Sequence, residues 1–71
     1  MREVVITTEP VELYKILKFE GLAPSGGAAK SAIEQGLVKV NGDVETRKRK
    51  KIISGDIINF DSEDLKIVFG Q

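Results

Sequence analysis

Three short turn signals divide the second half of the 71-residue chain and limit what it can fold into. Gly36 is placed to end a helix in the left-handed conformation. Asn41-Gly42 predicts a tight hairpin turn because both positions tolerate positive φ, and Ser54-Gly55-Asp56 predicts a second turn. The apolar segments beside them, 37–40 and 57–60, have the length and composition of strands. We therefore expect a helix that ends near residue 35, followed by short antiparallel strands.

The first half of the chain predicts one strand and two helices. Residues 3–7 are β-branched and apolar, as in a strand. Thr8 or Glu9 is expected to cap a first helix with Pro10 in its first turn. Ser25 is expected to cap a second helix over residues 26–35. With a last strand at 65–69, this order predicts an α+β fold in which two packed helices cover a small, mainly antiparallel β-sheet.

Length and composition exclude several classes of protein. Seventy-one residues are the size of one domain, which we expect to span residues 1–71. The chain has neither cysteine nor histidine, so we expect no enzyme, no metal site and no cofactor. The acidic residues at 61–64 are expected to form a solvated turn. No apolar run approaches the ~20 residues that a membrane span needs, and no signal peptide is recognisable. We expect a cytoplasmic protein.

The aromatic residues do not suggest a stacking surface. Phe19, Phe60 and Phe69 stand where core positions are expected, and Tyr14 is open to either interpretation. Proteins that bind RNA on a sheet surface present exposed aromatic side chains on adjacent strands, and the sequence does not show such a pattern.

Charge is concentrated although the net charge is zero. Residues 30–51 carry a net charge of +4, against −1 for residues 1–29 and −3 for residues 52–71. The densest part is the basic run, Arg47-Lys48-Arg49-Lys50-Lys51. Five adjacent cations repel one another, and a phosphate backbone relieves that repulsion as it binds. In an extended run, Arg47, Arg49 and Lys51 would point one way and the other two the opposite way. The following residues, Ile52-Ile53, are expected to return to the core. The alternative interpretations of the run are a solvated loop and a patch resembling a nuclear-localisation signal.

The start of the second helix offers a second place for a phosphate. Gly26 and Gly27 leave the backbone N–H groups of a helix N-terminus open, and Lys30 follows one turn later. The glycines could instead permit a tight entry after Pro24 or close packing on the first helix. The segment does not fit the nucleotide-binding P-loop, because no register places Gly, Lys and Ser or Thr as that motif requires.

The ordered motifs resemble a known family. Gly36-Leu37-Val38-Lys39-Val40-Asn41-Gly42, followed by Gly55-Asp56-Ile57-Ile58, is similar to the core of the S-four RNA-binding domain, named after the fourth protein of the small ribosomal subunit. The core motif covers residues 25–60. With Ser25-Gly26-Gly27, Ala29-Lys30 and residues 45–49, the chain looks most like the small stand-alone bacterial subfamily represented by YbcJ and YaaA.

The resemblance implies two helices packed on a small sheet and binding of structured RNA by the helix face and the adjoining loop. Lys30 is the only cation on the second helix, where the larger family is richer in basic residues, so more of the binding falls to backbone donors and the basic run. Family members are often attached to pseudouridine synthases, tRNA synthetases or ribosomal proteins, whereas we expect no such second domain here. The residues expected to bind RNA are Ser25, Gly26, Gly27, Lys30, Lys39, Arg47, Lys48, Arg49, Lys50 and Lys51.

The sequence thus predicts a monomeric, non-catalytic protein that binds structured ribosomal or transfer RNA in ribosome assembly or translation. Ribosomal or assembly proteins are further candidate partners. The alternative is a protein-interaction module whose basic loop docks an acidic partner. A ubiquitin-like sulfur carrier is set aside, because it needs a C-terminal Gly-Gly and this chain ends in Gly70-Gln71.

Overall fold

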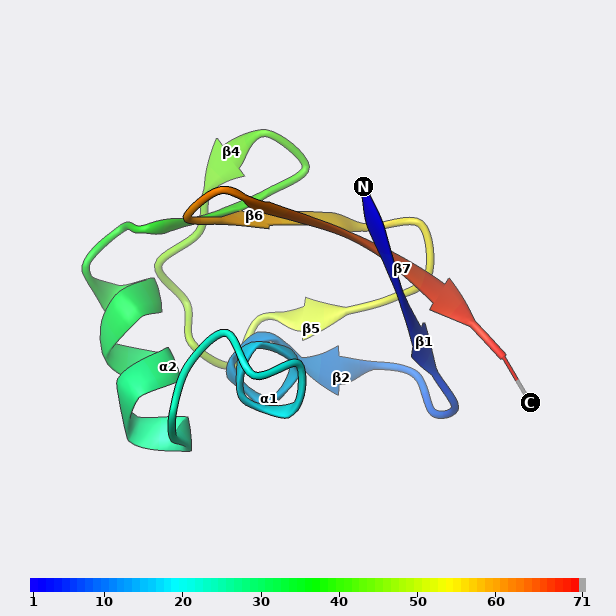
Figure 1. Cartoon of the computed structure of the whole chain (residues 1–71), viewed down its shortest axis with the longest axis horizontal. Coiled ribbons are helices and arrows are strands. Elements are labelled where there is room, and N and C mark those ends of the chain that lie inside the picture. The colour runs from blue at the N-terminus through cyan, green and yellow to red at the C-terminus, as the bar shows by residue number, and fades with distance from the viewer. Residues whose placement is uncertain (71) are drawn as a thin grey trace.

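The computed structural model describes residues 1–70 and shows an α+β fold (Figure 1). Five strands form one sheet in the order β1-β7-β6-β3-β4, in which only the β1–β7 pair is parallel. These strands are β1 (Arg2–Ile6), β7 (Glu63–Phe69), β6 (Ile57–Phe60), β3 (Val38–Val40) and β4 (Asp43–Val44). The two short strands β2 (Val11–Glu12) and β5 (Lys51–Ile52) form a separate antiparallel pair. The predicted α+β fold with a mainly antiparallel sheet is confirmed.

Helices α1 (Leu13–Phe19) and α2 (Gly26–Glu34) lie on the same side of the five-stranded sheet (Figure 1). Each buries residues spaced three and four apart, which is the face that an α-helix turns toward a core. The sheet closes this core with alternating side chains from β3, β6 and β7. The buried residues of these elements are Leu13, Ile16, Leu17, Ala29, Ala32, Ile33, Val38, Val40, Ile58, Leu65 and Ile67.

Helix α2 and the hairpin after it form as the local sequence predicts. Ser25 caps the helix, with its Oγ accepting a hydrogen bond from the N–H of Ala28 at 3.1 Å. The helix ends before Gly36, which has φ +79°. In the turn from β3 to β4, Asn41 and Gly42 have φ values of +53° and +89°, as a tight hairpin turn requires.

Helix α1 begins later than the sequence predicts. Pro10 does not lie in its first turn, because Val11 and Glu12 pair with Ile52 and Lys51 as strands β2 and β5. The helix starts at Leu13, and the residue before it, Glu12, provides no capping hydrogen bond from its side chain. The prediction failed because helix start signals are local, whereas the pairing partner of Val11 and Glu12 lies about forty residues away in the sequence.

Two further predictions about the core are wrong. The side chains of Phe19 and Phe69 are 69% and 49% exposed, while Phe60 is half-buried against the core. Phe19 lies off the helix face formed by Leu13, Ile16 and Leu17, and Phe69 is the last residue of β7. Ile52 is fully buried as expected, but Ile53, the residue after β5, is 49% exposed.

Candidate nucleic-acid interface

The basic run forms a turn and not an extended strand. The N–H of Lys50 donates to the carbonyl oxygen of Arg47 at 3.1 Å, which closes a turn over Lys48 and Arg49, and only Lys51 belongs to a strand. The alternation of side chains that an extended run would have therefore does not apply. Helix α1 donates two hydrogen bonds to the backbone of this turn. The N–H of Leu13 donates to the carbonyl oxygen of Lys50 at 2.9 Å, and the N–H of Tyr14 donates to that of Lys48 at 3.2 Å. Two of the free N–H donors in the first turn of α1 are thereby satisfied, and the same bonds hold the basic run.

Three of the five cations in the run are paired with carboxylates, which reduces their mutual repulsion. Arg47 makes two side-chain hydrogen bonds to Glu45, at 2.9 and 3.0 Å. These bonds lower the pKa of Glu45 from its ordinary value of 4.5 to about 2. Lys48 lies 3.4 Å from Glu34 of α2, and Arg49 lies 3.3 Å from Glu12.

Glu12 also contacts Lys15 at 3.2 Å. The pKa of Glu12 is lowered first by Lys15 and then by Arg49. The carboxylate thereby links the start of α1 to the basic run.

Lys50 and Lys51 form no ion pair with any residue in 1–70. Together with Arg47 and Arg49 they line an open hollow of about 400 Å³. A hollow lined by cations alone suits an anionic group, and its two lysines are not engaged in an ion pair with any carboxylate of the described chain.

Tyr14 is the functional candidate that the sequence left undecided. Its half-buried ring packs on the core, with Lys30 Nζ 4.6 Å and Arg49 Cζ 5.3 Å from the ring centroid. These distances lie within the range of cation–π attraction. The ring therefore brings α2 and the basic run together. The sequence signal was weak, since it consisted only of an aromatic residue beside the apolar face of a helix.

The start of α2 presents two free backbone donors. The N–H groups of Gly26 and Gly27 have no hydrogen-bond acceptor within residues 1–70. Neither glycine has positive φ. A Cβ atom at Gly26 would lie 3.7 Å from the ring of Tyr14, and one at Gly27 would lie 3.9 Å from Ser25 Oγ, both ordinary contacts. Neither a tight entry of the chain into α2 after Pro24 nor close packing of α2 on α1 therefore requires glycine at positions 26 and 27.

Lys39 lies apart from the other predicted residues. Its neighbours in β3, Val38 and Val40, are buried on the side of the sheet that the helices cover, so Lys39 projects from the opposite face. The structure thus brings Ser25, Gly26, Gly27, Lys30 and the basic run to the helix side of the molecule and leaves Lys39 on the other side of the sheet.

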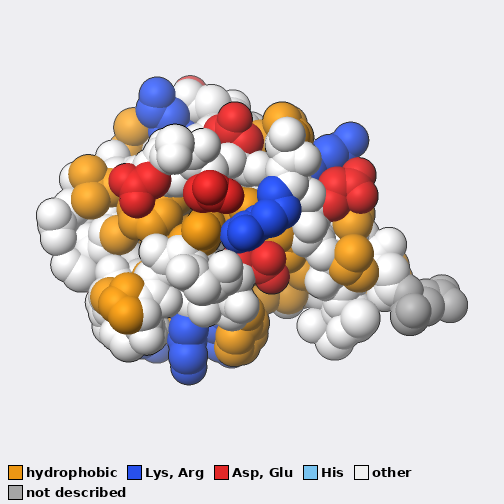
Figure 2. Space-filling view, in the orientation of Figure 1, with side chains coloured by type: hydrophobic (Ala, Val, Ile, Leu, Met, Phe, Trp, Pro, Cys, Tyr) orange, Lys and Arg blue, Asp and Glu red, His pale blue; other side chains and the backbone are white. Residues whose placement is uncertain are grey.

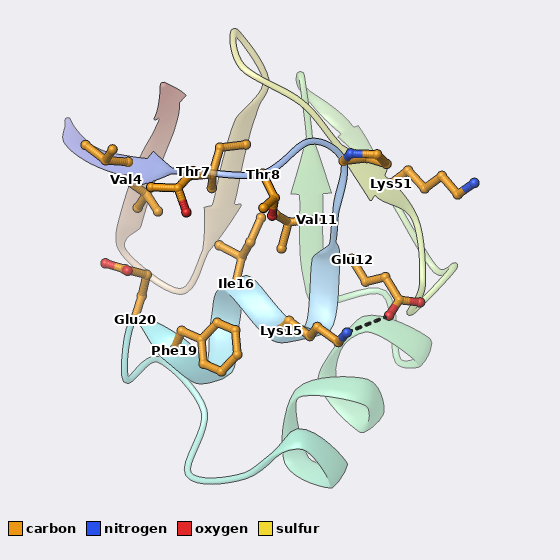
Figure 3. A pocket seen from close by; sticks show the side chains of 13 residues that line it. Val4, Thr7, Thr8, Val11, Glu12, Lys15, Ile16, Phe19, Glu20 and Lys51 are labelled. Carbon is orange, nitrogen blue, oxygen red and sulfur yellow. Dashed lines mark ion pairs between the residues drawn. The ribbon is translucent and has the colours of Figure 1, made fainter. Parts of the chain in front are cut away.

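A second hollow of about 590 Å³ lies between β1 and α1 (Figure 3). Ile16 and Val11 line its apolar part, and Lys15 and Glu12 form an ion pair at its edge. Lys51 lines both hollows. The face shown in Figure 2 carries cations and carboxylates side by side, with apolar atoms between them, so it presents no large area of one charge.

Comparison with known proteins decides the family. Residues 4–68 match the family described as S4 domain, the S-four domain of the sequence motif. The chain belongs to the S4 domain family. It is 50% identical over 58 residues to YbcJ of Escherichia coli (strain K12), which carries the name of an RNA-binding protein. The same identity is found with the YbcJ protein of Shigella flexneri, and the match covers 82% of this chain and 83% of each relative.

The fold agrees with this family. The solution structure of Escherichia coli YbcJ, described as containing an alfaL motif involved in RNA binding, superposes with a TM-score of 0.73 at 45% sequence identity. The superposition covers 96% of this chain and 87% of YbcJ. The predicted S4 domain fold and the resemblance to the YbcJ-like subfamily are confirmed. Within residues 1–70, no helix has the length and apolar character needed to cross a membrane.

Proposed function

We propose that this S4 domain protein binds structured RNA without modifying it, through the basic run and the start of α2. The names given to YbcJ and to its solution structure support RNA as the ligand class. The residues proposed to contact RNA are Ser25, Gly26, Gly27, Lys30, Arg47, Lys48, Arg49, Lys50 and Lys51. Lys39, which the sequence also suggested, projects from the opposite face of the sheet and lies outside this surface.

The proposal rests on one observation: two cations from different parts of the chain, Lys30 and Arg49, lie close to the ring of Tyr14. Lys30 is the only cation on α2, and Arg49 belongs to a distant loop, yet both lie within 5.3 Å of the same ring centroid. Beside them are the hollow lined by Arg47, Lys50 and Lys51 and the free amides of α2. Cations and backbone donors that face one region are suited to several phosphates of one RNA strand.

We further propose that the RNA is ribosomal or transfer RNA, and that the protein acts as a monomer in the cytoplasm during ribosome assembly or translation. Structured RNA suits the site because the described strands offer no row of exposed aromatic side chains on which single-stranded bases would stack. Ribosomal or assembly proteins are its proposed protein partners.

The test is an RNA titration of the ¹⁵N-labelled protein at two salt concentrations. If about five phosphates are neutralised, the logarithm of the affinity should fall with the logarithm of salt concentration at a slope of about −3.5 to −4.5. The amides of Gly26, Gly27, Lys30 and residues 47–51 should shift together.

Different outcomes separate the alternatives. Shifts confined to residues 47–51 would limit the interface to a non-specific cationic loop. A slope near zero would contradict phosphate contact. The absence of any shift, combined with loss of binding to an acidic protein on charge reversal of the basic run, would favour the protein-interaction module.

A further inference from the structure

The ring of Tyr14 is the contact that holds Lys30 in place. Lys30 Nζ lies 4.6 Å from the ring centroid and makes no ion pair with a carboxylate of residues 1–70. A lysine side chain on a solvated helix face ordinarily samples many rotamers, so a contact that fixes its ammonium group directs its charge. Attraction by the negative face of an aromatic ring can do this without neutralising the cation.

Arg49 is held at the same ring by two different partners. Its Cζ atom lies 5.3 Å from the centroid, and its Nη1 lies 3.3 Å from Glu12. Tyr14 follows Glu12 by two residues, so the acidic partner and the aromatic partner of Arg49 both come from the start of α1. The ring thus has one cation from α2 and one from the basic run within 5.3 Å of its centroid, and its attraction for both offsets part of the repulsion between them.

The ring itself is fixed from two directions. It packs against the hydrophobic core, and its Cε2 lies alongside Gly26 at the start of α2. The backbone N–H of Tyr14 separately donates to Lys48 at 3.2 Å, and the N–H of Leu13 donates to Lys50 at 2.9 Å. Those backbone bonds do not depend on the side chain at position 14. Replacing the side chain therefore tests the ring while the basic run keeps its backbone anchors.

We propose that Tyr14 is a positioning residue of the RNA-binding surface, whose ring joins Lys30 and Arg49 into one cationic pair directed at the same RNA. The inference rests on the proposed function. It adds Tyr14, an uncharged residue that the distribution of cations along the sequence does not identify. In this arrangement Tyr14 acts through the two cations and does not itself stack on a base.

The experiment compares Tyr14→Leu, Tyr14→Phe, Lys30→Ala and the double variant Tyr14→Leu/Lys30→Ala, with RNA affinity measured at several salt concentrations. Tyr14→Leu should weaken binding about fivefold, the effect of losing partly exposed cation–π contacts, and should make the salt slope less negative. Tyr14→Phe keeps the ring face and should bind within about twofold of the parent. Lys30→Ala should cost less affinity in the Tyr14→Leu background than in the parent chain, because the two residues act as one unit.

Lys66→Ala is the matched control, because it removes one exposed cation from β7 on the other side of the sheet. It should leave the coupling between positions 14 and 30 unchanged. A ¹H–¹⁵N spectrum of each variant establishes that the fold is retained. Parent-like affinity and salt slope for Tyr14→Leu, or additive effects of the two substitutions, would overturn the proposal.

A second readout keeps this inference separate from the proposed function. The side-chain methylene protons of Lys30 should show ring-current shifts that persist in Tyr14→Phe and vanish in Tyr14→Leu. If these shifts are present but the parent chain binds no RNA, the proposed function fails and the RNA role of Tyr14 fails with it, while the ring contact stands. If the shifts are absent, Tyr14 does not position Lys30, whatever RNA the chain binds.

Discussion

The side-chain amide of Asn41 donates a hydrogen bond to the carboxylate of Asp56, with Nδ2 and Oδ1 3.0 Å apart. Asn41 Oδ1 accepts from the N–H of Ile57 at 2.9 Å, and Asp56 Oδ2 accepts from the N–H of Ile53 at 3.0 Å. The turn after β3 and the turn before β6 are thereby tied together. Because the basic run lies between these turns in the sequence, the same bonds fix both ends of the segment that carries it.

Asn41→Ala should lower the free energy of unfolding by about 2 kcal/mol. The substitution removes the two side-chain hydrogen bonds of Asn41. It also places alanine at a positive φ, a conformation that asparagine tolerates better. Asn41→Gly is the matched variant: it loses the same hydrogen bonds but adopts positive φ freely. Its stability in urea should fall between those of the parent and Asn41→Ala. Parent-like stability of Asn41→Ala would show that the two turns form independently of this contact.

Phe19→Ser should change the free energy of unfolding by no more than about 0.5 kcal/mol, because the side chain is 69% exposed at the end of α1. Ile16→Ala, three residues earlier on the buried face, should cost about 2–5 kcal/mol. Urea unfolding followed by circular dichroism distinguishes the two. A loss for Phe19→Ser as large as that for Ile16→Ala would mean that Phe19 is buried in solution.

The elements that the sequence predicted well are those decided by neighbouring residues. The cap at Ser25, the end of α2 at Gly36 and the hairpin at Asn41-Gly42 each depend on a few adjacent positions. The start of α1 was predicted wrongly because its first donors bond to Lys48 and Lys50, far along the chain. The prediction that Phe19 and Phe69 are buried rested on residue type, whereas their exposure depends on how the elements of the fold pack around them.

The same distinction applies to the candidate site. The basic run was visible in the sequence because its cations are adjacent. Its carboxylate partners were not, since Glu12 and Glu34 come from other elements of the fold. The place of Tyr14 between Lys30 and Arg49 was also hidden, because it arises only when α1, α2 and the basic run pack together.

Gly27→Ala should preserve or raise stability, by up to about 1 kcal/mol, because alanine favours helix and the added Cβ meets only Ser25 Oγ at 3.9 Å. If the free amides of α2 contact phosphate, the added methyl group should weaken RNA binding about fivefold, equivalent to one lost hydrogen bond. Gln35→Ala, at the other end of the helix, should leave RNA affinity unchanged. Unchanged affinity for Gly27→Ala would remove the start of α2 from the interface.

Glu34→Gln should strengthen RNA binding by about two- to threefold, because it removes the carboxylate 3.4 Å from Lys48 that competes with phosphate for this cation. Glu63→Gln is the charge-matched control, since Glu63 lies on β7 and faces Arg2 at 4.0 Å. Isothermal titration at one salt concentration compares the two variants. Equal gains in both would mean that net charge, and not the release of Lys48, governs affinity.

The ion pair between Glu45 and Arg47 should make folding stability depend on pH in a defined acidic window. The pKa of Glu45 is lowered to about 2 in the folded chain from an ordinary value of 4.5, so its contribution is complete above pH 4.5 and is lost as pH falls toward 2. Glu45→Gln removes this titration and, at neutral pH, should lower the free energy of unfolding by no more than about 1 kcal/mol. Urea unfolding at several pH values should therefore show the parent losing stability more steeply than Glu45→Gln between pH 4.5 and 2. Parallel curves for the two proteins would show that Glu45 titrates alike in the folded and unfolded states, and that its hydrogen bonds to Arg47 do not persist in solution.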